Sequence, residues 1–307
     1  MNNILTLEHV TKQFGAQKVL NDLNMTVPEH SVFGFIGRNG AGKTTTMNLI
    51  LGFLQADSGT ISICGESVAY GNTRTNRFLG YLPDVPEFYG YMTPIEYLTL
   101  CGEISGMSSS AIRHRIQELL PLVGLEEVQK KACKKFSRGM KQRLGIAQAL
   151  LNKPKLLLCD EPTSALDPAG RREILQILSQ IKTETTIVFS SHILSDMETI
   201  CDHVGILEHG KIQMEGELDV IRQSYRSDTL LLELADNAQI SLLLSQLVKL
   251  PSLTVEQESD RTVRLTTNHM DADTQQILKI LYTHQIRIQR LEIAEPSLEQ
   301  LFLEVTA

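Results

Sequence analysis

Short, continuous apolar runs alternate with longer amphipathic segments along the first part of the chain. Runs of this kind stand at 32–36, 156–159 and 186–189, and each is too short for a buried helix, so we expect fully buried strands. Between them, apolar residues recur at helical spacing, as in the segment 171–181. Strands that alternate with helices predict an α/β fold, in which helices cover both faces of a mostly parallel sheet.

Two regions depart from this alternation. Short alternating segments over 4–27 predict an antiparallel meander, that is, an antiparallel β subdomain. Residues 90–151 form the longest stretch with helical spacing, and we expect a helical subdomain there. Thr93 followed by Glu96 predicts a capping box, and Ser137 is well placed to cap a later helix in the same region.

Near residues 223–228 the composition turns polar, and a second unit is expected to begin. We therefore predict a large domain over 1–224 and a small α+β domain over 225–307. The apolar pattern of the second domain is βαββαβ-like, with a closing helix from Ser297. Its last strand slips in alternation by one residue at Gln289-Arg290, which predicts a β-bulge.

A glycine-rich segment directly follows the first buried strand. Gly37 to Thr44 matches G-x-x-x-x-G-K-[ST], with a strand before it and a helix after it, which is the context of a phosphate-binding loop. Lys43 should reach the β- and γ-phosphates of a nucleotide, and Thr44 should ligate Mg²⁺. The predicted phosphate site consists of Gly37, Arg38, Asn39, Gly40, Ala41, Gly42, Lys43, Thr44 and Thr45.

Carboxylates and a histidine follow the other two buried strands. Asp160 and Glu161 end the strand 156–159, and His192 follows the strand 186–189. Two buried carboxylates are costly without a partner, and Mg²⁺ on a nucleotide triphosphate is a sufficient one. Ligands of open α/β sheets bind beyond the carboxyl ends of the strands, where all these residues are expected. Phe14 can stack on the adenine face, and it can equally be a packing residue.

Composition narrows the classes of protein. The net charge of −7 argues against non-specific binding to nucleic acid, which needs a basic surface. Five scattered cysteines without a C-x-x-C pair indicate neither a disulfide framework nor a zinc site. The N-terminus lacks the pattern of a secretion signal, and no apolar run approaches the roughly 18 residues that cross a bilayer. If the chain works at a membrane, another polypeptide is expected to supply the membrane part.

Five motifs occur in a fixed order: the phosphate loop, FSRGMKQR, LLLCDEP, SALD and the strand that ends SSH. In this order the chain resembles the nucleotide-binding subunit of ABC transporters, which are P-loop NTPases. The resemblance implies that ATP and Mg²⁺ bind, that a second copy of the chain dimerises with it around two ATP, and that separate transmembrane permease subunits are driven from the cytoplasmic face of the membrane.

The resemblance also implies roles for single residues. Asp160 would hold Mg²⁺ through water together with Thr44, Glu161 would be the general base, and His192 would contact the γ-phosphate. Phe14 takes the position of the adenine-stacking aromatic. Ser137 and Gly139 would complete the site of the opposite subunit, and Asp167 would lie in the dimer-interface turn.

The remainder of the chain, including its ending EPSLEQLFLEVT, resembles the accessory domain on ATPase subunits of drug, antibiotic and lantibiotic exporters. We therefore expect an exporter ATPase. The alternative is a soluble ABC-type ATPase that acts on ribosomes or another target outside the membrane. A third hypothesis is that the C-terminal domain makes the ATPase a regulated switch.

Two segments depart from the family pattern. The signature, usually leucine-serine-glycine-glycine-glutamine, here reads Phe136-Ser137-Arg138-Gly139-Met140 and keeps only Ser137 and Gly139. Arg138 stands where the first glycine is usual. Asp84 stands where the family usually has a glutamine. A carboxylate can ligate Mg²⁺ through water but cannot donate a hydrogen bond. Asp84 is thus a candidate metal ligand, or a turn residue between two prolines.

Overall fold

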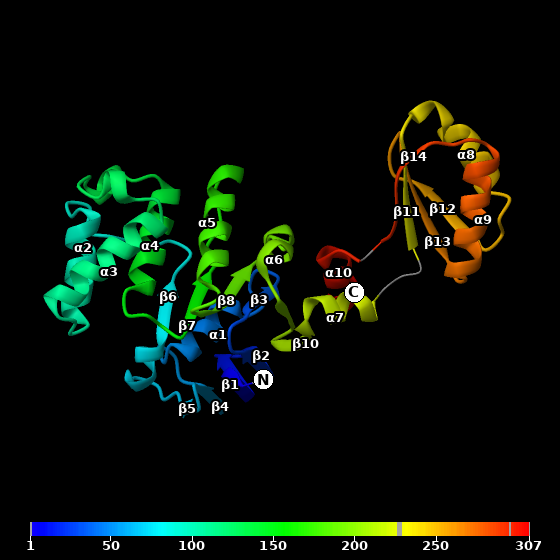
Figure 1. The fold of residues 1–307 in the computed structure, drawn as a ribbon. Coiled ribbons are helices and arrows are strands. Elements are labelled where there is room, and N and C mark those ends of the chain that lie inside the picture. Colours follow the sequence, from blue (N-terminus) through cyan, green and yellow to red (C-terminus); the bar gives the residue numbers. More distant parts are fainter. Residues whose placement is uncertain (1, 226–228, 295, 307) are drawn as a thin grey trace. The chain divides into compact units, whose positions relative to one another are not determined.

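A six-stranded sheet lies at the centre of the first part of the chain (Figure 1). Its strand order is β10-β9-β3-β8-β7-β6, and β3, β6, β7, β8 and β9 run parallel while β10 runs antiparallel. The strands are β3 (Val32–Gly37), β6 (Leu79–Leu82), β7 (Leu156–Asp160), β8 (Thr186–Ser191), β9 (His203–Glu208) and β10 (Lys211–Glu217). Every residue of β3, β7 and β8 is buried, which confirms the three predicted core strands.

An antiparallel sheet of order β2-β1-β4-β5 packs against it, and the predicted antiparallel pairing of residues 4–27 is confirmed. Its strands are β1 (Asn3–Phe14), β2 (Gln17–Pro28), β4 (Ser58–Ile63) and β5 (Glu66–Ser67). One apolar core contains residues of both sheets and of helix α1 (Lys43–Ile50), among them Leu7, Phe35 and Met47. The phosphate loop is therefore anchored at both ends in this core.

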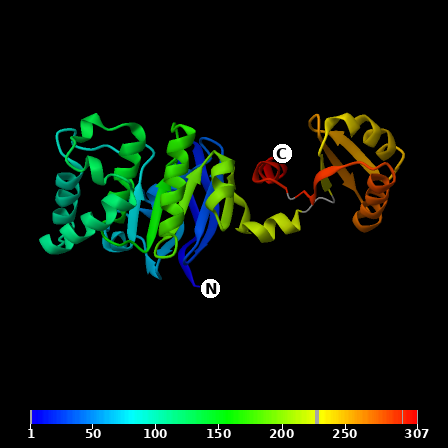
Figure 2. The ribbon, with the colours of Figure 1, turned by 45° about the horizontal axis from the view of Figure 1, so that its top comes forward.

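Helices cover the parallel sheet and gather beside its β6 edge (Figure 2). They are α2 (Pro94–Ile104), α3 (Ser109–Leu122), α4 (Arg138–Leu150), α5 (Pro168–Ile181) and α6 (Leu194–Ile200), with 3₁₀ turns η1 (Arg74–Phe78), η2 (Glu126–Val128) and η3 (Cys133–Lys135). Both bonds of the capping box at Thr93 and Glu96 are present, as predicted. Pro121 lies inside α3, which ends one residue later at Leu122.

The structure describes residues 2–225, 229–294 and 296–306 of the 307. The chain divides into two compact units, 1–218 with 305–307 and 219–304. The boundary predicted between 224 and 225 lies at the end of α7 (Leu218–Ser224), and it stays a prediction. In the described residues no helix has the length and the apolar character that a membrane crossing requires.

The second unit contains a four-stranded antiparallel sheet of order β12-β13-β11-β14. Its elements are β11 (Thr229–Leu234), η4 (Asn237–Gln239), α8 (Ile240–Leu247), β12 (Leu253–Gln257), β13 (Thr262–Thr267), α9 (Met270–Thr283) and β14 (Ile288–Ile293). Helix α10 (Leu298–Thr306) belongs to this unit up to residue 304. The order from β11 to β14 is the predicted βαββαβ. Arg290 pairs with Glu233 and Ile288 with Leu234, so Gln289 is the extra residue of the predicted bulge.

Candidate functional site

The phosphate loop joins the carboxyl end of β3 to the start of α1. Gly40 and Gly42 have φ values of 83° and 114°, which residues with a side chain rarely adopt. A Cβ on Gly42 would lie 2.7 Å from Cδ2 of Leu20, whereas a Cβ on Gly40 would meet no other atom within 4 Å. The loop is therefore packed on one side at Gly42 and open at Gly40, as a surface that receives a phosphate has to be.

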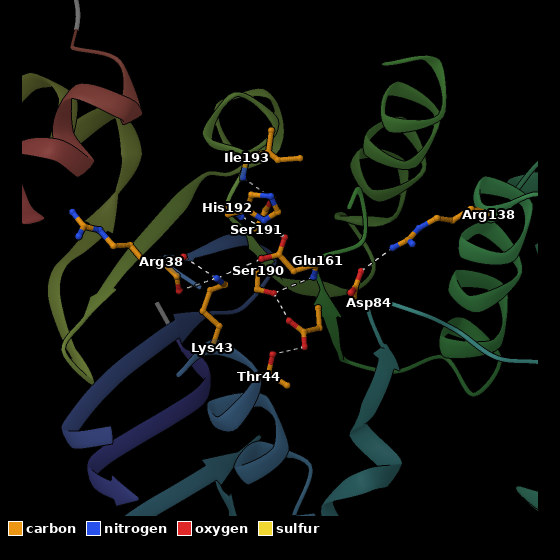
Figure 3. A network of polar contacts seen from close by, with 12 residues as sticks. Arg38, Lys43, Thr44, Asp84, Arg138, Glu161, Ser190, Ser191, His192 and Ile193 are labelled. Atoms are coloured by element: carbon orange, nitrogen blue, oxygen red, sulfur yellow. Dashed lines mark hydrogen bonds and ion pairs between the residues drawn. The ribbon is translucent and has the colours of Figure 1, made fainter. Parts of the chain in front are cut away.

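Lys43 is buried and turns back over this loop. Its Nζ donates to the carbonyl oxygen of Gly37 at 2.7 Å and lies 3.4 Å from Oε1 of Glu161 (Figure 3). The side chain of Arg38, by contrast, points away from Glu161 in Figure 3. One ammonium group thus faces both the loop and the carboxylate at the end of β7. Phosphate oxygens at the loop would lie within its reach.

Asp160 is buried with two hydroxyl partners. Thr44 Oγ1 donates to one carboxylate oxygen of Asp160 at 2.9 Å, and Ser190 Oγ donates to the other at 2.7 Å. Thr44 and Asp160 are 116 residues apart in sequence, yet the fold brings them together as predicted. A hydroxyl beside a carboxylate is a suitable pair of hard oxygen ligands for Mg²⁺, which keeps several waters and substrate oxygens in its coordination shell. The residues present fit that ion.

Glu161 contacts His192 across the ends of β7 and β8. Glu161 Oε2 lies 2.8 Å from His192 Nδ1 and 3.4 Å from its backbone nitrogen (Figure 3). The backbone of Glu161 has φ 49°, a left-handed conformation that is strained for a residue with a side chain. Its N–H donates at 3.1 Å to both oxygens of Ser190, which hold this conformation. The strained backbone turns the carboxylate toward His192 and Lys43.

Phe14 ends β1 and is 47% exposed. It lines one cavity together with Gly40, Gly42, Thr45 and Glu161. Lys12 Nζ lies 5.3 Å from the centre of the Phe14 ring, and Asp57 holds that ammonium at 3.0 Å. The exposed ring is available for stacking beside the phosphate loop.

The remaining predicted residues do not join this cluster. Ser137 accepts from the backbone of Met140 at 3.3 Å and caps α4, with Gly139 in the first turn. Asp167 accepts from Gly170 at 3.2 Å and caps α5. In the described part of this single chain, neither side chain is hydrogen-bonded to the phosphate loop, to Asp160 or to Glu161. Their expected roles toward a nucleotide would need a second subunit.

Asp84 is bound to the signature helix instead. Its Oδ1 lies 3.1 Å from Nη2 of Arg138, and no hydrogen bond in the described residues joins it to Thr44 or Asp160. The prediction that Asp84 is a metal ligand therefore stays a prediction, and it would require this ion pair to open.

Sequence reasoning missed several residues around these groups. Ser190, Lys12 and Asp57 received no role, although each binds a predicted site residue or its neighbour.

Two further residues near Asp160 have shifted pKa values. Burial raises the pKa of the Cys159 thiol, so that residue stays protonated beside Asp160. Burial, with smaller contributions from the charges of Asp160 and Asp84, raises the pKa of Tyr81 to about 12.

Comparison with known proteins adds two family matches. Residues 20–164 match the family described as ABC transporter, and residues 216–306 match the family described as ATP-binding protein DrrA1-3-like, C-terminal domain. The bacitracin transport ATP-binding protein BcrA of Bacillus licheniformis is 37% identical over 99% of this chain and 98% of its own length. The chain belongs to the ABC transporter family. It is an ABC-type ATPase, the ATP-binding subunit of a transporter.

Two further relatives extend the comparison. The linearmycin resistance ATP-binding protein LnrL of Bacillus subtilis is 30% identical over 99% of this chain and 98% of its own length. A solved dimer of the ATP-binding cassette MJ0796, bound to ADP and Pi, is 25% identical with a TM-score of 0.63, over 70% of this chain and 98% of that one. The predicted P-loop ABC-type fold and the predicted class of transporter ATPase are thereby confirmed.

Proposed function

We propose that this chain powers the export of an antibiotic or a similar toxic compound through a separate membrane permease. The observation that carries the ATPase chemistry is the contact of Lys43, Glu161 and His192 at the carboxyl ends of three neighbouring strands. The antibiotic class is supported by BcrA and LnrL, because both are similar to this chain over nearly its whole length, including the C-terminal domain.

In this proposal each contact group has one task. Lys43 and the N–H groups of the phosphate loop bind the triphosphate of the substrate ATP. Thr44 and Asp160 hold Mg²⁺, which neutralises charge on the phosphate oxygens. Glu161 accepts a proton from the attacking water, and His192 orients that carboxylate and contacts the γ-phosphate. Since phosphoryl transfer needs little covalent help from a protein, positioning and charge neutralisation supply most of the catalysis.

A second copy of the chain would complete the site. In one chain the loop, the metal ligands and the base lie on one side of the γ-phosphate, and Ser137 with the N-terminus of α4 lies elsewhere. The same residues from a second copy would supply hydrogen-bond donors on the open side. The solved dimer of MJ0796 supports this arrangement for its family. Two ATP molecules then favour the closed dimer, and hydrolysis removes the γ-phosphate contacts that hold it closed.

The membrane part would come from a permease bound to this dimer at the cytoplasmic face. The relatives compared above act in transport or in antibiotic resistance, and this favours a permease over the ribosomal alternative. The C-terminal domain contains no ATP-site motif, so we assign it to the partner contact or to regulation rather than to hydrolysis.

The test uses the Glu161→Gln variant, tagged, with ATP and Mg²⁺, in cells solubilised with mild detergent. We expect hydrolysis at least about a hundredfold slower, as loss of a general base predicts. We also expect a trapped dimer that co-purifies with a polytopic membrane protein in comparable amount, identified by mass spectrometry. The Lys43→Ala variant, prepared in the same way, should recover little of the membrane protein, because this variant should bind ATP poorly.

Two outcomes would contradict the proposal. Normal ATP turnover by Glu161→Gln would remove that residue from the role of general base. Recovery of ribosomal proteins in place of a permease would establish the soluble alternative.

A further inference from the structure

Two of the positions at which this sequence departs from the family pattern contact each other. Asp84 stands in place of the usual glutamine, and Arg138 in place of the first glycine of the signature. Asp84 Oδ1 and Arg138 Nη2 are 3.1 Å apart, and their side chains are 45% and 40% exposed (Figure 3). The negative charge of Asp84 therefore balances the positive charge of Arg138.

A second bond joins the same two elements. Gln142 is fully buried, and its Nε2 donates to the backbone oxygen of Asp84 at 2.8 Å. Arg138 and Gln142 lie one turn apart on α4, so they share a face of that helix. That face holds Asp84 by its side chain and by its backbone. The loop after β6 and the first turn of α4 are linked at two points.

The strength of the ion pair indicates what it does. An exposed pair of this kind contributes less than about 1 kcal/mol to folding, so stability alone does not account for it. Arg138 is the first residue of α4 and lies at the positive end of the helix dipole, where a cation is disfavoured by about 0.3–1 kcal/mol. Asp84 offsets that repulsion. Without the Asp84 carboxylate, the Arg138 side chain would no longer be held against the loop after β6.

We propose that Asp84 and Arg138 act as one positioning unit for the ATPase reaction. The pair fixes the first turn of α4, and with it Ser137 and Gly139, relative to the loop after β6. That loop follows a strand adjacent to β7, which carries Asp160 at its carboxyl end and leads into Glu161. The inference rests on the proposed function, in which Ser137 and Gly139 meet the ATP of the opposite subunit. While the pair is closed, Asp84 is not a metal ligand.

A double-mutant cycle tests the pair. Its variants are Asp84→Gln, Arg138→Gly and the combination of both, which restores the family pattern at the two positions. Each single change leaves one charge uncompensated, and we expect it to lower kcat about five- to twentyfold. ATP binding to the monomer should stay within about twofold. The combination should be less impaired than either single variant, and the charge exchange Asp84→Arg with Arg138→Asp should recover part of the lost rate.

The control is an ion pair of similar exposure in the same unit. Lys182 and Asp202 are 3.3 Å apart and 38% and 40% exposed, so Lys182→Gln should leave kcat unchanged. Raising NaCl from 0.1 to about 0.5 M should slow the unmodified protein, since salt screens exposed charges, and should slow the combined variant much less. Circular dichroism at each step checks that all variants are folded.

The outcomes separate the two proposals. If Glu161→Gln forms no dimer with ATP, the proposed function fails. If that dimer forms but the Asp84 and Arg138 effects on kcat are additive, or absent, the positioning role is overturned while the proposed function stands.

Discussion

Asp160 in the ATP-binding unit and Asp273 in the C-terminal unit are buried in nearly the same way. Their exposed fractions are 4% and 2%, and each carboxylate accepts hydrogen bonds from two hydroxyl groups. Asp160 is bonded to Thr44 and Ser190. Asp273 is bonded to Ser252 at 2.7 Å and to Thr267. By local chemistry alone, the two sites are equivalent.

Their surroundings differ. Asp160 lies at the carboxyl end of a parallel strand, and one of its hydroxyl partners belongs to a loop that can bind phosphate. Asp273 lies in the first turn of α9, where it ties the helix to the end of β13 and to the residue before β12. A buried carboxylate with satisfied hydrogen bonds is therefore not by itself a catalytic signal. In the proposed function, Asp160 differs from Asp273 because its partner Thr44 would bind Mg²⁺ together with it.

Among the variants that distinguish the Asp160 site from the Asp273 site, Asp160→Asn is expected to have the largest effect on ATP turnover. Loss of the negative charge would remove the proposed Mg²⁺ ligand, while the amide oxygen can still accept from Thr44, so the fold should persist. We expect ATP turnover to fall about a hundredfold or more at saturating Mg-ATP. Phosphate release measures the rate, and circular dichroism checks the fold. Turnover within threefold of the unmodified protein would make Asp160 a structural residue like Asp273.

Asp273→Asn should give the opposite result. Hydrogen bonds to a charged group contribute about 1.5–3 kcal/mol each, so weakening two of them should destabilise the contact of α9 with β13 by about 2 kcal/mol. ATP turnover should stay unchanged, because no hydrogen bond in the described residues links Asp273 to the phosphate loop. Hydrogen exchange of peptides from 262–283, read by mass spectrometry, measures the local stability. Slower turnover with unchanged exchange would contradict the comparison.

The pH dependence of this stability is expected to have a defined sign. Hydrogen bonds from Thr267 and then Ser252 lower the pKa of Asp273. The stabilisation is thus fully present above the unfolded value of about 3.9 and is lost as pH falls through the folded pKa. The exchange difference between the unmodified protein and Asp273→Asn should be constant from about pH 5 to 8 and should shrink below about pH 4. A difference that grows on acidification would reverse the assignment.

Much of the fold follows from local patterns in the sequence. Continuous apolar runs specified β3, β7 and β8, because strands covered on both faces have no polar side. The slip at Gln289 was readable because apolar residues stand on either side of it, at Ile288 and at Leu291 and Ile293, although no residue of β14 is fully buried. Strand β12 (Leu253–Gln257) could not be located by the same means. It contains only two apolar residues, Leu253 and Val255, so its apolar alternation is too short to stand out.

The site was predictable where a motif carries the chemistry, as at Lys43 and Thr44. Pairs of side chains that meet only through the tertiary fold were not. Arg138 and Asp84 are 54 residues apart, and their contact depends on how α4 packs on β6. Both positions stood out in the sequence only as departures from a family pattern.

The smallest effects are expected from a matched pair of serine variants. Ser190 donates to Asp160 and Ser252 donates to Asp273, each at 2.7 Å, so Ser190→Ala and Ser252→Ala remove equivalent bonds. We expect Ser190→Ala to lower turnover about three- to tenfold, because its hydroxyl also accepts from the strained backbone of Glu161. Ser252→Ala should cost about 1 kcal/mol of local stability and leave turnover unchanged.

Phosphate release and hydrogen exchange on the same two proteins decide the outcome. If both variants change hydrogen exchange equally and neither slows turnover, Ser190 only satisfies the hydrogen-bonding requirement of the buried Asp160 carboxylate. Slower turnover in Ser190→Ala alone would show that two hydrogen bonds of the same length can have different effects on catalysis. The reason would be that Ser190 also positions the strained backbone of Glu161, whereas Ser252 has no such neighbour to position.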